Sequence, residues 1–305
     1  MSKPPTRCGF IAIIGRPNVG KSTLLNRLVG QKISITAPRP QTTRHRIHGV
    51  KTVGPDQAVY VDTPGLHRES RRTLNRYLNR TARSALHDVD ALLFVVEALH
   101  WTGEDQYVEE LIRELPAPAI LVVNKVDKVV DKTRLLPYLE ERSRSGRYRE
   151  LFPASAQDGD NVEALERKVM ELLPSSVHLF PDDQVTDRSQ RFLAAELVRE
   201  KLTRRLGQEI PYALAVSIED FEELEALIRI RAVIWVERDG QKKIVIGKGG
   251  GVLKEIGRLA RLDLEHELGK KVFLELWVKV REGWSDDSGA LSSLGYDDAF
   301  QDPGG

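Results

Sequence analysis

The chain of 305 residues has a single cysteine, Cys8, and only 6% aromatic residues. One cysteine excludes a disulfide framework and the cysteine spacing of zinc fingers, so we expect Cys8 to be a packing residue before the first strand. Apolar runs are short, as in Ala91–Val96, whereas a transmembrane helix needs about 20 apolar residues. The N-terminus also lacks the apolar core of a signal peptide. These absences predict a cytoplasmic protein.

Net charge is nearly absent too, because 46 basic residues oppose 45 acidic ones. The charge is unevenly placed, however. Residues 286–305 hold five Asp and no Lys or Arg, which leaves 46 basic against 40 acidic groups in the preceding 285 residues. This acidic tail is rich in Gly, Ser and Asp, and we expect 286–305 to be disordered. The hydrophobic share of 41% is ample for a core, and the length predicts about two domains.

A glycine-rich segment lies between the apolar run Phe10–Ile14 and a segment with helical spacing, Thr23–Leu28. Its pattern, G-x-x-x-x-G-K-S in a strand–turn–helix context, predicts a phosphate-binding loop. Lys21 is expected to reach the β- and γ-phosphates, and the Ser22 hydroxyl to ligate Mg²⁺. The residues predicted to contact the phosphates are Gly15, Arg16, Pro17, Asn18, Val19, Gly20, Lys21, Ser22 and Thr23. The segment therefore predicts a nucleoside triphosphate site.

The base is predicted by Asn124-Lys125-Val126-Asp127, which follows the apolar strand 120–123. Ligands bind at the carboxyl ends of parallel strands. The Asp127 carboxylate can accept from N1–H and the exocyclic amine of guanine, a donor pair that adenine lacks. Asn124 can bond the purine edge and hold the loop, while the Lys125 stem lies along the ring. A backbone N–H of Ser155-Ala156 is expected to reach guanine O6. The ligand is therefore predicted to be GTP or GDP.

Two further segments are expected to sense the γ-phosphate. Asp62-Thr63-Pro64-Gly65 ends the strand 58–61, so Asp62 would hold Mg²⁺ through water and the Gly65 N–H would contact the γ-phosphate. Upstream, Gln41-Thr42-Thr43-Arg44 offers a threonine to complete the Mg²⁺ shell. Thr43 is favoured for this position, and Thr42 remains an alternative.

Leu66 stands where many GTPases have a glutamine that orients the attacking water. No arginine finger can be assigned within the chain, so hydrolysis is expected to be slow without a partner. Asn18 offers a carboxamide oxygen that could hold K⁺ against the phosphates, or it could simply hydrogen-bond the loop. The predicted catalytic group is Lys21, Asn18, Thr43 and Gly65, with Leu66 beside the nucleotide.

Strands and helices alternate up to about residue 175. Strands are expected near 10–14, 58–62, 91–96, 119–123 and 150–153, and helices near 21–29, 72–86, 103–114, 133–143 and 161–172. This alternation predicts an α/β domain, 1–175, with a mostly parallel, doubly wound sheet. Residues 176–187 read as a linker. A smaller α+β domain is expected over 188–285.

In this second domain we expect a helix over 188–206, strands over 212–218, 228–236, 242–246 and 270–280, and a helix over 252–268, with a hairpin turn at Asp239-Gly240. A glycine loop, Gly247-Lys248-Gly249-Gly250, opens the 252–268 helix. Such a G-x-x-G loop lets a nucleic-acid backbone approach closely, as in KH domains. The expected RNA-binding residues are Gly247, Lys248, Gly249, Gly250, Lys242, Lys243, Lys254 and Arg258.

Together with 274–280 (LELWVKV) and 41–46 (QTTRHR), these motifs resemble the Era family of bacterial GTPases over residues 9–286. The resemblance implies a GTPase domain joined to a KH-type domain that binds the 3′ end of small-subunit ribosomal RNA and assists assembly of that subunit. It also implies peripheral association with the inner membrane. Leu66 fits GTPases with a hydrophobic residue in place of glutamine, and Asn18 fits relatives that use potassium. A departure is that 244–246 leaves little room for the short helix that usually precedes a KH loop.

Two other functions remain open from the residues. The chain could be a GTPase that acts on another RNA, such as tRNA, or a GTP-loaded RNA clamp with little turnover. A monomer is expected in each case.

Overall fold

The computed structural model describes residues 6–39, 42–66, 73–145, 148–206, 214–294 and 296. Gln41 of the predicted switch segment lies outside these residues. The chain divides into two compact units. The first unit comprises Met1–Ser34, Thr43–Ser70 and Leu78–Asp187, and the second comprises Ile35–Thr42, Arg71–Tyr77 and Arg188–Gly305. The division after Asp187 falls at the end of the linker expected from the sequence.

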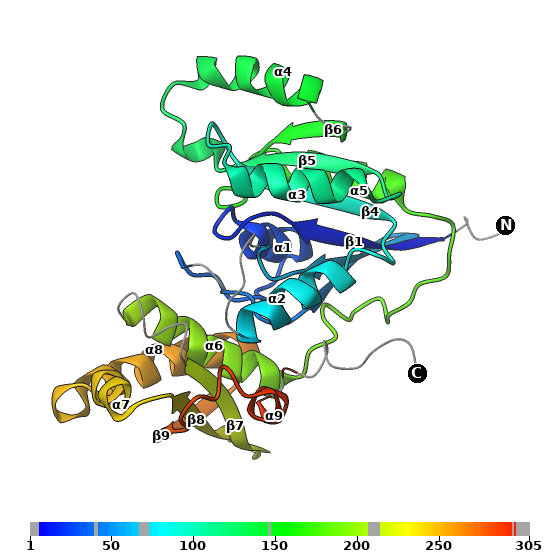
Figure 1. Cartoon of the computed structure of the whole chain (residues 1–305). Coiled ribbons are helices and arrows are strands. Elements are labelled where there is room, and N and C mark those ends of the chain that lie inside the picture. The colour runs from blue at the N-terminus through cyan, green and yellow to red at the C-terminus, as the bar shows by residue number, and fades with distance from the viewer. Residues whose placement is uncertain are drawn as a thin grey trace, which may run out of the picture. The chain divides into compact units, whose positions relative to one another are not determined.

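The first unit is built on a six-stranded sheet in the order β2-β3-β1-β4-β5-β6. Strands β1, β4, β5 and β6 of this sheet are labelled in Figure 1. Its strands are β1 (Arg7–Ile14), β2 (Ile47–Val53), β3 (Asp56–Asp62), β4 (Ala91–Glu97), β5 (Ala119–Asn124) and β6 (Tyr148–Pro153). Only β2 is antiparallel, to β3. The central strands are apolar throughout because helices cover both faces. The predicted mostly parallel α/β sheet is confirmed.

The helices of this unit are α1 (Lys21–Val29), α2 (Thr73–Ser84, shared between the units), α3 (Gly103–Arg113), α4 (Leu135–Ser145) and α5 (Val162–Leu172). Short 3₁₀ turns, η1 (Val126–Lys128) and η2 (Lys132–Arg134), follow β5. Side chains of α2, α3 and α4 pack on one sheet face around Phe94, Leu121 and Leu66. Helices α1 and α5 contact each other and β3, and so cover the opposite face.

The second unit carries a three-stranded sheet, β7-β8-β9. Its strands are β7 (Leu214–Glu223), β8 (Leu227–Val236) and β9 (Lys271–Val280), and its helices are α6 (Gln190–Arg205), α7 (Asp239–Ile246), α8 (Gly251–Leu268) and α9 (Ser288–Ser293). Strand β8 pairs antiparallel with β7 and parallel with β9. Alternate residues such as Ile234 and Val278 pack against α6 and α8, which gives the unit its core. The predicted α+β architecture is confirmed.

Residues 239–246 were expected to form a turn and a strand, and this prediction is wrong. They form α7, which is followed by η4 (Lys248–Gly250) and α8. The β-branched run 244–246 suggested a strand, but it lies in helix α7, where Val245 is the buried residue. The Gln241 side chain accepts from the backbone N–H of Glu237 at 2.8 Å and so supports the helix start. The helix expected before a KH loop is therefore present.

The expectation of disorder over 286–305 is wrong for the residues that the structure describes. Asp287 caps α9 by accepting from the backbone N–H of Ala290 at 2.7 Å. Leu291 and Tyr296 are buried, and Tyr296 stacks on Trp284 with ring centroids 6.4 Å apart. The scattered apolar residues of this acidic segment anchor it in the second unit. Residues 295 and 297–305 lie outside the described residues.

Candidate functional site

The phosphate-binding loop lies at the carboxyl end of β1, where Gly20 caps α1 in the left-handed conformation with φ of 102°. Lys21, the first residue of α1, is buried, with its side chain folded back over the loop. Its Nζ donates to the carbonyls of Gly15 at 3.1 Å and Arg16 at 3.0 Å. The ammonium group is thus held at the centre of the loop, where phosphate oxygens can replace these carbonyls.

Lys21 and Asp62 form the electrostatic centre of the site. Burial lowers the pKa of Lys21 to about 8, although Asp62 raises it. Burial likewise raises the pKa of Asp62, which is opposed by Lys21 and by hydrogen bonds from Ser22, Ser34 and Thr43. Each charge is costly because it is removed from water. Both charges would be better compensated by a bound polyphosphate and cation.

Three oxygens converge where Mg²⁺ was predicted. Ser22 Oγ donates to Asp62 Oδ2 at 2.8 Å, and Thr43 Oγ1 lies 2.7 Å from Ser22 Oγ and 3.2 Å from Asp62 Oδ2. Asp62 Oδ1 is buried with no hydrogen-bond partner among the described residues. Hydroxyl and carboxylate oxygens are the ligands that Mg²⁺ prefers. Thr42 Oγ1 instead donates to the Arg39 carbonyl at 2.7 Å, so Thr43 and not Thr42 lies beside Ser22 and Asp62 in this structure.

The base-binding loop is tied to the phosphate loop by Asn124. Its Nδ2 donates to the Val19 carbonyl at 2.7 Å, and its Oδ1 accepts from the Ala156 N–H at 2.9 Å. The neighbouring Ser155 is fully buried. Asp127 Oδ1 is buried with no hydrogen-bond partner among the described residues. An unsatisfied carboxylate oxygen is expensive, and the donor pair of guanine would satisfy it.

Other predicted residues of the nucleotide site take different positions. Gly65 approaches the phosphate loop so closely that an added Cβ would lie 2.7 Å from Pro17 Cγ. Thr63 Oγ1 donates to the Ile13 carbonyl of β1 at 3.0 Å, in a buried position. The Leu66 side chain is 1% exposed and packs in the sheet core. Leu66 therefore contributes no side chain to the site, and Thr63 serves to hold the strand ends together.

Asn18 is exposed at the outer turn of the phosphate loop and has a φ of 63°. Its carboxamide makes no hydrogen bond with the part of the chain that the structure describes. The alternative in which Asn18 braces the loop through its side chain therefore finds no contact to support it. The side chain is free to meet a ligand.

The glycine loop of the second unit lies between α7 and α8, in a helix–G-x-x-G–helix arrangement. Gly249 has φ of 59°, and no atom lies within 4 Å of a Cβ added there. The loop and the two helices that flank it carry five cations that make no ion pair with any described residue: Lys242, Lys243, Lys248, Lys254 and Arg258. Arg261, by contrast, is paired with Glu265 at 2.8 Å. Unpaired cations beside an open backbone loop suit a phosphate backbone.

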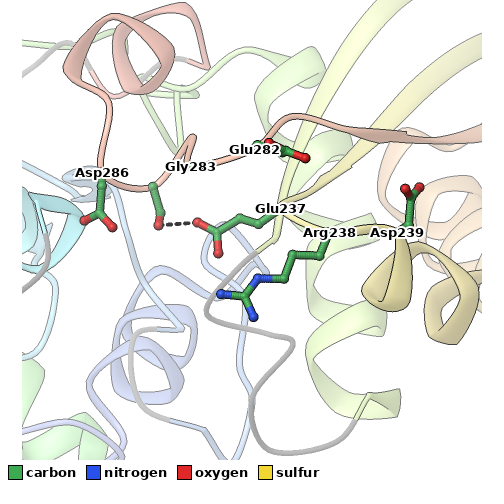
Figure 2. A pocket seen from close by; sticks show the side chains of 7 residues that line it. Glu237, Arg238, Asp239, Glu282, Gly283 and Asp286 are labelled. Carbon is green, nitrogen blue, oxygen red and sulfur yellow. Dashed lines mark hydrogen bonds between the residues drawn. The ribbon is translucent and has the colours of Figure 1, made fainter.

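The second unit also has a hollow lined mainly by acidic residues, in contrast to the basic glycine loop. It measures about 450 Å³ and is lined by Glu237, Arg238, Asp239, Glu282, Gly283, Ser285 and Asp286. The Ser285 hydroxyl donates to Glu237 Oε1. Figure 2 shows the side chains of Glu237, Arg238 and Asp286 at this hollow. Four carboxylates disfavour a phosphate ligand here. Within the described residues, no group of three or more His, Cys, Asp or Glu is placed to hold a metal ion.

Sequence reasoning missed two contributors to the nucleotide site. Glu97 ends β4 and contacts both Arg16 and Lys125, and Asp105 of α3 holds Arg16. The only sequence signal was an acidic residue at the carboxyl end of an apolar strand.

None of the described helices is long and apolar enough to cross a membrane.

Comparison with known proteins agrees with both units. A family model described as "50S ribosome-binding GTPase" matches residues 10–125, and a KH domain model matches residues 209–285. GTPase Era of Coxiella burnetii is 56% identical over 294 residues, which cover 96% of this chain and 99% of the relative. GTPase Era of Marinobacter nauticus is 55% identical over 295 residues, 97% of each chain.

Two solved structures match with a TM-score of 0.92 and 38% identity, covering 95% of this chain and 99% of theirs. One is Era in complex with MgGDPNP and nucleotides 1506–1542 of 16S ribosomal RNA. The other is a variant of Aquifex aeolicus Era bound to GDP and AlF₄⁻.

The fold and site thus define a P-loop GTPase that carries a KH domain and binds guanine nucleotide with Mg²⁺. The chain belongs to the Era family of GTPases, at 55–56% identity over nearly its whole length.

Proposed function

We propose that this GTPase binds the 3′ end of small-subunit ribosomal RNA through the loop 247–250 and assists assembly of the small ribosomal subunit. The observation that carries the proposal is the set of five unpaired cations around an open G-x-x-G loop. The related Era structure in complex with nucleotides 1506–1542 of 16S ribosomal RNA supports this choice of RNA. Lys248 and Lys254 would neutralise phosphates, while the loop lets the backbone approach.

In the nucleotide site, we propose that Ser22 and Thr43 hold Mg²⁺ directly and that Asp62 holds it through water. The ion supplies charge neutralisation at the β- and γ-phosphates. Lys21 would bind the β- and γ-phosphates as well, and the Gly65 N–H would contact the γ-phosphate. Asp127 reads guanine, while Asn124 holds the two loops in register.

Hydrolysis is proposed to be slow in the isolated protein, since Leu66 stands where many GTPases have the glutamine that orients the attacking water, and its side chain is buried in the sheet core. We propose that Asn18 holds K⁺ beside the phosphates, at the position where an arginine finger would otherwise bring its charge. The exposed, unbonded carboxamide of Asn18 supports this role.

A monomer in the cytoplasm, with a fraction associated peripherally with the inner membrane, is proposed from the family resemblance. Membrane fractionation followed by detection of the chain tests the location. A signal confined to the soluble fraction would contradict the membrane association and support only the cytoplasmic location.

Crosslinking in cells, followed by RNA sequencing, tests the RNA target. We expect reads to concentrate at the 3′ end of small-subunit ribosomal RNA and to fall in a Gly249→Asp variant. Enrichment of tRNA would contradict the proposal and favour a different RNA substrate. A protein that binds the expected RNA but completes only a single turnover of GTP would be a clamp.

A further inference from the structure

We propose that Glu97 is a positioning residue of the nucleotide site, which fixes Lys125 of the base-binding loop and joins that loop to Arg16 of the phosphate loop. Glu97 Oε2 accepts from Lys125 Nζ at 2.9 Å and from an Arg16 guanidinium nitrogen at 3.3 Å. One carboxylate oxygen therefore bridges the two loops that must hold opposite ends of the nucleotide.

The topology of the sheet brings these groups together. Glu97 is the last residue of β4 and lies directly opposite Asn124, the last residue of β5, in the parallel register. Lys125 follows immediately and has a left-handed backbone with φ of 65°. This conformation is uncommon for a residue with a side chain, so neighbouring contacts must hold it. Among the described residues, Glu97 is the one hydrogen-bond partner of the Lys125 ammonium.

The charges around Glu97 are arranged so that it stays ionised. Burial alone would raise its pKa, but Lys125 and then Arg16 outweigh burial and hold the pKa below the usual range. The side chain is 28% exposed, and those of Lys125 and Arg16 are 20% and 12% exposed. Pairs shielded to this degree are screened less than surface pairs.

The two cations do not depend equally on Glu97. Arg16 also donates through Nε to Asp105 at 3.0 Å, and that carboxylate is fully buried at the start of α3. Asp105 is fixed in turn by Thr102, whose backbone N–H it accepts at 2.9 Å. Removing the Glu97 charge therefore leaves Arg16 anchored and releases Lys125. The effect of Glu97 on the nucleotide would pass through Lys125, because the Lys125 stem is expected to lie along the guanine ring.

This role predicts a specific kinetic signature. Glu97→Gln keeps the shape of the side chain but loses the charge, and should raise the dissociation rate of GDP by about 3- to 10-fold, the range for one charge-assisted hydrogen bond after screening. Asp127 still reads the exocyclic amine, so the ratio of GDP to inosine diphosphate affinity should not change. The rate at which bound GTP is hydrolysed in a single turnover should also stay the same, because the lost interaction is uniform binding.

The decisive test is a double-mutant cycle with Lys125→Met, which removes the ammonium and keeps a stem of similar length. We expect Glu97→Gln to have no further effect on GDP dissociation in the Lys125→Met background. Glu110→Gln serves as the matched control, since it removes an exposed carboxylate of α3 that contacts only Gln106 in the described chain. Additive effects of the two substitutions would overturn the proposal. A fall in the GDP to inosine diphosphate ratio, together with a lower melting temperature without nucleotide, would instead assign Glu97 a merely structural role and overturn it as well.

Discussion

The Asn124 side chain joins the two halves of the nucleotide site, because its Nδ2 donates to the Val19 carbonyl at 2.7 Å while its Oδ1 accepts from the Ala156 N–H. The side chain is 2% exposed, so water cannot replace either bond. The phosphate loop, the base-binding loop and the 155–156 loop therefore depend on one amide for their mutual position.

Asn124→Ala should weaken GDP binding by at least about tenfold, because it leaves a buried carbonyl and a buried N–H without partners, each at a cost of about 1–3 kcal/mol. Titration with a fluorescent GDP measures the change. Asn161→Ala is the control, since its side chain donates to the Pro153 carbonyl at an exposed site. An unchanged affinity in Asn124→Ala would show that the loops hold their positions without this amide.

Nucleotide binding should be coupled to proton uptake at alkaline pH. Burial lowers the pKa of Lys21 to about 8, and the bound phosphates would raise it again. Above that pH the free protein has lost the proton and the complex holds it, so affinity falls as pH rises, by at most about tenfold per unit. GDP titration calorimetry at about pH 7 and pH 8.8, in buffers with different ionisation heats, counts the proton.

The same pKa shift makes the stability of the nucleotide-free protein rise with pH, whereas the affinity for nucleotide falls. Between about pH 8 and pH 10.5 the unfolded chain holds more protons at Lys21 than the folded one, so the contribution of Lys21 to stability rises with pH in that window.

The control for the binding prediction is Lys21→Arg, which should bind GDP more weakly and without the pH dependence. Equal proton counts for the parent and Lys21→Arg would remove Lys21 from this coupling.

Restoring a glutamine after the Asp-x-x-Gly motif should not speed hydrolysis. The Leu66 side chain packs in the core with Ile14 and Phe94, so Leu66→Gln would bury an amide there rather than aim it at water. We expect the free energy of unfolding to fall by about 2–4 kcal/mol. Urea denaturation and single-turnover hydrolysis measure the two effects. A faster hydrolysis rate in a stably folded Leu66→Gln protein would mean that the side chain at position 66 leaves the core and faces the nucleotide when GTP binds.

Hydrolysis should be faster in potassium than in sodium at equal ionic strength, since general screening does not distinguish the two salts. Asn18→Ala should remove the difference while GTP binding persists, because Lys21 and Mg²⁺ supply most of the charge. Multiple-turnover phosphate release in matched chloride salts is the measurement. Identical rates in the two salts for the parent protein would contradict the cation site.

Most of the first unit could be predicted from the sequence because its strands are continuous apolar runs and its motifs sit at the strand ends. Strand β2 (Ile47–Val53) was missed, since His48, Lys51 and Thr52 break its apolar pattern. The sequence left the choice between Thr42 and Thr43 open, and the structure places the Thr43 hydroxyl beside the oxygens of Ser22 and Asp62. The contacts of Glu97 with Lys125 and Arg16 could not be predicted from the sequence, because they depend on how β4 and β5 pair in the sheet.

The second unit was less predictable because tertiary contacts override local preference. The 242–246 run favours a strand by composition but forms α7. The segment Ile35–Thr42 belongs to this unit although it precedes the switch threonine in sequence. The reason is a pair of polar contacts: the fully buried Glu200 of α6 accepts from the Thr36 N–H at 3.0 Å, and Arg204 donates to the Thr36 carbonyl at 2.9 Å. Residues so distant in sequence give no local signal of such a contact.

RNA affinity of the GTP-loaded protein, compared between Gly249→Asp and Gly269→Asp, tests the central claim most directly. Gly249 and Gly269 have similar φ values of 59° and 63°, and neither has an atom within 4 Å of an added Cβ, so the two substitutions strain the backbone alike. Only Gly249 lies in the loop where phosphate must approach. For an RNA that carries the 3′ end of 16S ribosomal RNA, at fixed salt, we expect Gly249→Asp to raise Kd by at least about tenfold. Gly269→Asp should leave Kd within about twofold of the parent, with GTP affinity unchanged in both. Equal RNA affinity for the two variants and the parent would contradict the account and reduce the loop to a structural turn.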